Sequence, residues 1–293
     1  MLFAGVLITV LWAPIPFGSI EPWAVGIVQV AAFLLVAIWV LACGARGVVV
    51  AQRNPLQLVV LALAALAFVQ SFAILPSGPT SVDPFSSRQA GTTIFALGCL
   101  FAVALVSIDS RRRVETAANA LFWLGFGLSV LGILQSVSGA QKIYWFRETN
   151  GNLLFGPFPN KNHFAGLMEL LLPLGLGMLA TGAVPRQRRG LYLFGALVIC
   201  IAVVLSRSRG GLLSLVAELV FLVAAAAFAF RSPRRGRSGN PAVVGVGALI
   251  LAAAVAVGRM RRGRGAARST IPGPCTTASS IPAADRTPRS ARP

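Results

Sequence analysis

Charged residues are scarce in this sequence, and acidic residues are the scarcest, since Asp and Glu together number 8 among 293 residues. All charged residues make up 12% of the chain, whereas a soluble domain carries about 25%. Hydrophobic residues make up 56%, and apolar runs of roughly 20 residues, the length that crosses a bilayer core, recur along the chain. The composition excludes an ordinary soluble domain and predicts an all-α, polytopic membrane helix bundle.

Histidine and cysteine are also rare, which limits the chemistry open to the chain. There is 1 histidine, His163, and the 4 cysteines have no CxxC or other metal-binding spacing. Three of the cysteines lie in or beside apolar runs, where a thiol usually serves as a small hydrophobic side chain. The sequence therefore predicts no disulfide framework, no metal site and no cofactor.

Nine apolar segments read as membrane helices. The first is short, with two prolines directly after it, but it has no basic region before it and a second apolar run follows at once. A first membrane helix is therefore favoured over a cleaved signal peptide, and the short length also raises the alternative of a start further upstream. The segments are Leu2–Ala13, a second that follows Pro22 and ends near Ala42, Leu56–Leu75, Gly91–Ile108, Ala117–Val137, Asn162–Val184, Leu191–Leu205, Leu212–Phe230 and Ala242–Val257.

Basic residues are abundant, and the formal net charge of +18 on its own resembles that of a nucleic-acid-binding protein. Twelve of the 26 basic residues, however, lie in four short connections between helices, while the alternate connections hold six. This bias is the positive-inside rule. We therefore expect no nucleic-acid partner and a cytoplasmic N-terminus. The connections near 14–21, 76–90, 138–161 and 206–210 then face outward.

The composition changes abruptly after Gly258. Residues 259–293 contain eight Arg and one Asp among many Pro, Ser and Thr, which is typical of a disordered segment. They would also place dense positive charge on the outer face, against the rule that the earlier connections follow. Either this tail contacts anionic lipid, or the reading frame is lost after the ninth helix, which is the favoured explanation. We thus expect a membrane domain, 1–258, and a basic tail, 259–293.

Two polar motifs stand at the start of helices that enter from the predicted outer face. GPFPNKNHF leads into the sixth apolar segment and SRSRGG into the eighth. The free N–H groups and the dipole at a helix N-terminus form an anion site. Arginine binds phosphate oxygens in pairs and lysine as a point charge. The candidate residues for binding a lipid diphosphate are Asn160, Lys161, Asn162, Arg207 and Arg209.

Each of these residues also has a simpler role. Lysine and arginine at helix ends extend to the membrane interface, and Asn160 or Asn162 can serve as a helix cap. His163 is the one candidate catalytic base near neutral pH, with a structural hydrogen bond as the alternative. Glu169 and Glu218 lie inside the apolar segments, roughly 12–14 Å deep. Such carboxylates are functional candidates, or they form interhelical hydrogen bonds while protonated.

GPFPNKNHFAGLMELLLPL, followed further along by VLSRSRGG, resembles the core of the O-antigen ligase and O-antigen polymerase-like membrane proteins, and PIPFGSIEPWA fits the bacterial ligase-like branch. The resemblance covers most of 1–258. It implies a multi-pass glycosyltransferase of the bacterial inner membrane that is inverting and metal-independent. Such an enzyme moves a glycan from undecaprenyl diphosphate to lipid A-core, another glycan or a protein. In the resemblance, Arg207 and Arg209 hold the diphosphate and stabilise the leaving group, and Asn160–His163 form the matching upstream segment.

This chain departs from the family pattern beyond the eighth or ninth helix. Family members there carry a large periplasmic loop, with a histidine that activates the acceptor, and then further spans, whereas this chain has the basic tail. We therefore expect a C-terminally truncated or frame-shifted member that keeps donor-lipid binding features without a complete catalytic site. The alternatives are a transporter or lipid flippase for polysaccharide precursors, which uses helix ends and buried carboxylates, and a non-catalytic membrane scaffold.

Overall fold

The computed structural model describes residues 1–49, 51–52, 54–72, 80–148 and 154–231, and the regular structure of these residues is helical. The predicted all-α class is confirmed for this part of the chain. Two 3-10 turns, η1 (Phe17–Ser19) and η2 (Arg186–Arg188), accompany the α-helices. The helices are α1 (Leu2–Trp12), α2 (Pro22–Arg46), α3 (Pro55–Ser71), α4 (Pro84–Ser107), α5 (Arg111–Val137), α6 (Lys161–Ala180), α7 (Arg189–Leu205) and α8 (Arg209–Arg231).

Side-chain caps set where several helices begin. The Asn54 side chain accepts a hydrogen bond from the backbone N–H of Leu56 at 2.9 Å, and Pro55 occupies the first turn of α3. Asp83 caps α4 and Ser110 caps α5 in the same way. Because these caps precede the apolar segments, α4 and α5 begin one to two turns before the predicted Gly91 and Ala117. The predicted starts were wrong here because they followed hydropathy alone.

Among the described residues, five helical segments are long and apolar enough to cross a membrane: α2, α4, α5, α6 and the segment Arg186–Leu205 that contains α7. Large apolar side chains also remain exposed on the helices, such as Leu58 on α3 (72%) and Leu213 on α8 (74%). Such exposure is compatible with a lipid environment and is unusual for a soluble fold. The structure is thus compatible with a membrane helix bundle. The number of nine spans stays a prediction.

The predicted ninth segment, Ala242–Val257, and the basic tail, 259–293, lie outside the described residues. The chain divides into two compact units, Met1–Ala254 and Val255–Pro293. Only the first contains described residues, so the predicted boundary at 258 and the nature of the tail stay predictions.

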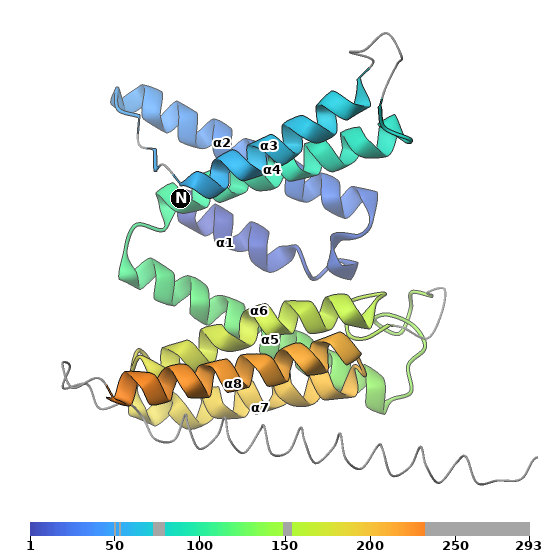
Figure 1. Ribbon diagram of the computed structural model, residues 1–293, viewed down its shortest axis with the longest axis vertical. Helices are drawn as coiled ribbons and strands as arrows, with labels where there is room; N and C mark the ends of the chain where they lie inside the picture. Colours follow the sequence, from blue (N-terminus) through green and yellow to red (C-terminus); the bar gives the residue numbers. More distant parts are fainter. Residues whose placement is uncertain (50, 53, 73–79, 149–153, 232–293) are drawn as a thin grey trace, which may run out of the picture. The chain divides into compact units, whose positions relative to one another are not determined.

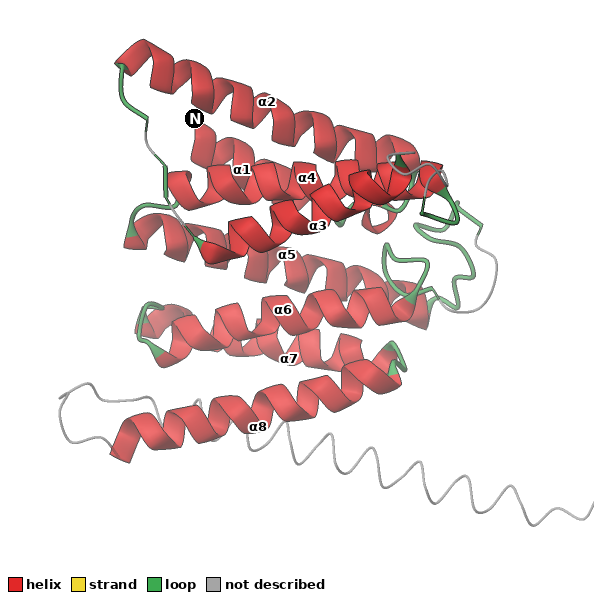
Figure 2. Ribbon diagram, turned by 45° about the horizontal axis from the view of Figure 1, so that its top comes forward, coloured by secondary structure: helices red, strands yellow, loops and turns green. Residues whose placement is uncertain are grey.

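Within the first unit, the helices pack in two groups (Figures 1 and 2). In one group, α4 contacts α1, α2 and α3; in the other, α6 contacts α5, α7 and α8, and α5 also packs against α7. Helix α1 contacts α5 and so joins the groups. The larger core cluster lies in the second group and includes Phe122, Phe164, Met168, Ile199 and Leu215. This cluster supports α6 and α8, the two helices that begin with the polar motifs.

Connections that were predicted to share the outer face contact one another. The Tyr144 hydroxyl donates to the carbonyl of Ile15 at 2.7 Å. Arg147 forms an ion pair with Glu21, and its guanidinium lies 4.1 Å from the centroid of the Phe17 ring. The α1–α2 connection and the α5–α6 connection therefore lie at the same end of the bundle.

The opposite end of the bundle gathers a different set of connections. Met1, Arg46, Ser107, Asp109 and Arg113 line one pocket there. Arg113 forms an ion pair with Asp109 at 2.9 Å and donates to the carbonyl of Ser107 at 2.7 Å. The N-terminus, the end of α2 and the end of α4 therefore lie together, while the predicted alternation of all the connections stays a prediction. Which end faces the cytoplasm stays a prediction.

Candidate functional site

A tight turn joins α7 to α8, and its geometry fixes the second polar motif. Arg207 has a left-handed backbone with φ +55°, which is uncommon outside glycine and reverses the chain within three residues. The Ser206 hydroxyl donates to the carbonyl of Val203 and accepts from the N–H of Ser208. The Ser208 hydroxyl accepts the N–H of Gly211 at 3.1 Å, which makes Ser208 the N-cap of α8.

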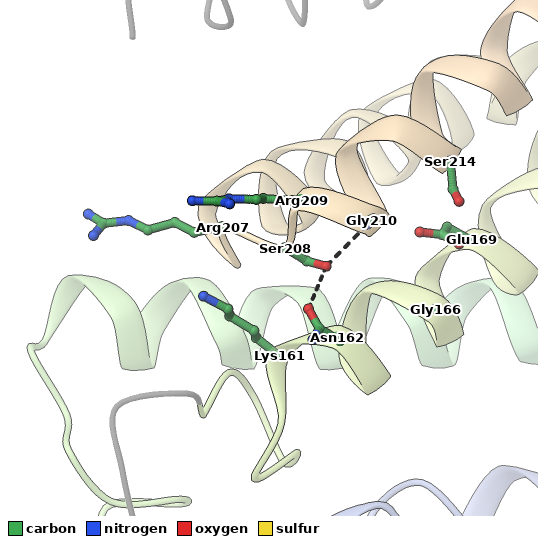
Figure 3. Close-up of a pocket in the computed structure, with 10 residues that line it drawn as sticks. Lys161, Asn162, Gly166, Glu169, Arg207, Ser208, Arg209, Gly210 and Ser214 are labelled. Carbon is green, nitrogen blue, oxygen red and sulfur yellow. Dashed lines mark hydrogen bonds between the residues drawn. The ribbon is translucent and has the colours of Figure 1, made fainter. Parts of the chain in front are cut away.

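The first polar motif is the capped start of α6. The side-chain oxygen of Asn160 accepts a hydrogen bond from the N–H of Asn162 at 2.9 Å, and the backbone carbonyl of Asn160 accepts one from the N–H of His163 at 3.1 Å. Asn160 is therefore the helix cap, which was the simpler of its two predicted roles. Asn162 instead accepts a hydrogen bond from the Ser208 hydroxyl at 2.8 Å. This bond ties the N-terminus of α6 to the N-terminus of α8 (Figure 3).

A pocket of about 630 Å³ opens between these two helix starts. Figure 3 shows Lys161, Arg207 and Arg209 extending toward the same side, with Glu169 and Ser214 at the other end of the pocket. Lys161 is half-buried, while both arginines are exposed. Three cations and two helix N-termini therefore lie around one pocket, while the predicted binding of a diphosphate there stays a prediction. The lining residues are Lys161, Asn162, Gly166, Glu169, Arg207, Ser208, Arg209, Gly210, Gly211 and Ser214.

The two glycines of the SRSRGG motif serve different purposes. A Cβ at Gly211 would lie 2.5 Å from the Cβ of Ala165 and 3.3 Å from Oε1 of Glu169. Gly211 is thus needed for the close contact between α8 and α6. A Cβ at Gly210 would have no neighbour within 4 Å. The packing of the described residues therefore does not require glycine at position 210, and the close approach of a ligand there stays a prediction.

The predicted acidic residues occupy different surroundings. Glu169 lines the pocket, and the hydroxyl of Ser214 on α8 lies beside its carboxylate, consistent with interhelical bonding. Both carboxylate oxygens of Glu218 are buried and have no hydrogen-bond partner among the described residues. The structure therefore brings Glu169 to the site and leaves Glu218 inside the α8 packing.

His163 does not join this cluster. Its side chain is exposed, and it is not among the residues that line the pocket. Its role as a catalytic base stays a prediction without support from its position. Within the described ranges, no group of three or more His, Cys, Asp or Glu residues could hold a metal ion.

Comparison of the chain with protein-family models, curated proteins and solved structures found no match. The resemblance in the two motifs therefore remains a hypothesis, and the function must be argued from the pocket itself.

Replacing Ser208 by alanine should lower the free energy of unfolding by about 1–2 kcal/mol, because a buried residue loses both the α8 cap and the hydrogen bond to α6. Thermal unfolding in detergent measures this loss. Ser110→Ala is the matched control, since Ser110 caps α5 through Arg113 and is exposed. Equal losses in the two variants would show that the bond to Asn162 contributes nothing.

Proposed function

We propose that the chain is an O-antigen ligase-like glycosyltransferase that binds a glycan linked to undecaprenyl diphosphate at the mouth between α6 and α8. It transfers the glycan to lipid A-core, another glycan or a protein at the periplasmic face of the bacterial inner membrane, without a metal ion. The observation that carries the proposal is the convergence of Lys161, Arg207 and Arg209 at two helix N-termini. The two sequence motifs that supply these residues agree with it.

The pocket suits a diphosphate for electrostatic reasons. Guanidinium groups pair with phosphate oxygens, and helix N-termini favour anions. The carboxylate of Glu169 lies at the far end of the pocket from the three cations in Figure 3, so it forms no ion pair with them. A lipid carrier also enters this site naturally, because the helices on either side expose apolar side chains such as Leu170 and Leu213.

The same groups would assist the reaction. Transfer breaks the bond between the anomeric carbon of the sugar and the phosphate oxygen, while the acceptor hydroxyl forms a new bond on the opposite face of the ring. Negative charge develops on the departing diphosphate, and fixed cations stabilise that charge more in the transition state than in the ground state. The proton of the acceptor passes to a base, which the resemblance places in the large periplasmic loop that family members carry where this chain has residues 259–293.

A transporter or lipid flippase is the second candidate function. Glu218 favours it, because its buried carboxylate lacks a hydrogen-bond partner among the described residues of the bundle. Ionisable groups within membrane segments commonly mark substrate or proton pathways.

The two functions separate in one experiment with a full-length version of the protein that carries the periplasmic loop, in proteoliposomes that contain a fluorescent lipid-linked glycan and an acceptor. Glycosyltransfer that persists in EDTA, without movement of the carrier between leaflets, is the expected result. Movement of the carrier without transfer would favour the flippase. If the protein neither transfers nor moves the lipid, both functions fail and a scaffold role is favoured.

A further inference from the structure

A second pocket, of about 300 Å³, lies against the same two cations and extends toward the end of α5. Lys161 and Arg207 line both pockets. The remaining wall of the second pocket is uncharged and includes Gln135, Ser136 and Phe155. A ligand that fills both pockets would have an anionic group at Lys161 and Arg207 and a neutral polar group beside Gln135.

Gln135 is the unusual member of this wall. Its side chain is 1% exposed, and neither Oε1 nor Nε2 has a hydrogen-bond partner among the described residues. Its backbone, by contrast, is well satisfied, because the Ser138 hydroxyl and the N–H of Ala140 both donate to its carbonyl. Buried amides in folded proteins are nearly always paired. The unpaired amide lines a cavity, so a ligand in that cavity could supply its missing hydrogen bonds.

The chemistry of the wall indicates which ligand fits. A glutamine amide donates and accepts at once, so it pairs with hydroxyl and acetamido groups. Phe155 packs closely on α5, since a Cβ at Gly132 would lie 2.4 Å from its ring, and it gives the pocket an apolar side. A polar amide beside an aromatic ring matches a sugar, which has hydroxyl groups at its edges and an apolar C–H face. The volume lies at the lower end of the usual range for ligand pockets, about 300–1,000 Å³, and suits one sugar ring rather than a long glycan.

We propose that this pocket holds the sugar residue joined directly to the diphosphate, with Gln135 hydrogen-bonded to its hydroxyl or acetamido groups. This inference rests on the proposed function, because it takes Lys161 and Arg207 to hold the phosphates. Gln135 then selects the first sugar of the donor, while the cations bind the part that all donors share. Sites built to hydrogen-bond a polar substrate group discriminate strongly against analogues that lack it.

The test compares two probes on the full chain in detergent or nanodiscs: undecaprenyl diphosphate, and the same lipid carrying one N-acetylhexosamine. Wild-type protein should bind the sugar-bearing lipid at least about tenfold more tightly. Gln135→Leu should remove this preference and leave the affinity for undecaprenyl diphosphate unchanged. Its unfolding temperature should be equal or higher, because the buried amide has no partner among the described residues to lose.

The controls separate the possible failures. Methionine is closer in shape to glutamine than leucine is, and Gln135→Met should also lose the preference for the sugar-bearing lipid. Gln89→Leu, at an exposed site on α4, should keep that preference. A preference that survives in both Gln135 variants, with lipid diphosphate still bound, overturns the sugar pocket alone. A lower unfolding temperature in both variants assigns Gln135 a structural role and also overturns it. Failure of the wild type to bind either lipid overturns the proposed function instead.

Discussion

In a full-length version of the protein that carries the periplasmic loop, alanine at Arg207 or at Arg209 should lower the rate of glycan transfer by about 10²–10³-fold, the loss typical when one group that stabilises developing charge is removed. The loss should occur with little change in stability. Both arginines are exposed, and neither side chain forms a hydrogen bond or ion pair that joins it to another described residue. Their removal therefore breaks no structural contact at the mouth. Transfer in proteoliposomes and thermal unfolding of the same preparations measure the two effects.

A lysine replacement at Arg209 and an alanine replacement at a distant arginine serve as controls for this experiment. Arg209→Lys keeps the charge but loses the paired hydrogen bonds to phosphate, so it should recover only part of the transfer rate. Arg112→Ala is the matched control, because Arg112 is an exposed arginine at the first turn of α5 and lies outside the pocket. It should leave transfer unchanged. Equal rates in Arg207→Ala, Arg209→Ala and the wild type would remove the basis of the proposed mechanism.

The approach of Lys161 to Arg207 and Arg209 could be predicted from the sequence. The charge bias places the α5–α6 and α7–α8 connections at the same end, and each motif directly precedes a helix, so the cations must meet near one surface. Hydropathy alone carried less information about helix limits. It missed the first turns of α4 and α5, whose caps, Asp83 and Ser110, stand in polar sequence before the apolar runs.

Which candidates on α6 line the pocket could not be predicted, because that depends on which helix faces meet. Asn162, Gly166 and Glu169 lie at i, i+4 and i+7, so they share one face of α6, and that face lines the pocket. His163 lies about 100° away from Asn162 around the helix and is therefore not on this face. This face can be recognised as the pocket wall only once α8 is known to pack on α6. The sequence offered both Asn162 and His163 as candidates, and only Asn162 lines the pocket.

Ser208 and Gln135 are the residues that sequence analysis missed. Ser208 stood inside the SRSRGG motif, and a serine directly before Arg-Gly-Gly at a helix start is a cap signal that the charges obscured. Gln135 lies in the last turn of an apolar helix and carries no pattern of its own. Its importance comes from burial without a partner, which is a property of the packed structure.

Phe122→Ala should produce the largest loss of stability, about 3 kcal/mol in the free energy of unfolding. The Phe122 side chain is 0% exposed and stacks on Tyr192 with ring centroids 5.3 Å apart. A Cβ at Gly175 would lie 2.3 Å from the Phe122 ring, and one at Gly195 would lie 3.0 Å from it. The two glycines thus make room for the ring where α5, α6 and α7 meet, and alanine would leave a cavity that these helices cannot fill.

The size of the Phe122→Ala loss tests whether packing, rather than transfer from water, holds the bundle together. Between helices in lipid the transfer contribution is small, which places the loss at the lower end of the usual 3–5 kcal/mol. Phe194→Ala is the control, since that ring on α7 is 54% exposed, and it should change stability by less than about 0.5 kcal/mol. Gly175 lies 14 residues beyond Lys161 on α6, about 21 Å along the axis, so Phe122→Ala should still bind undecaprenyl diphosphate below its unfolding temperature. Equal destabilisation by both phenylalanine variants would show that this ring does not organise the helices that carry the site.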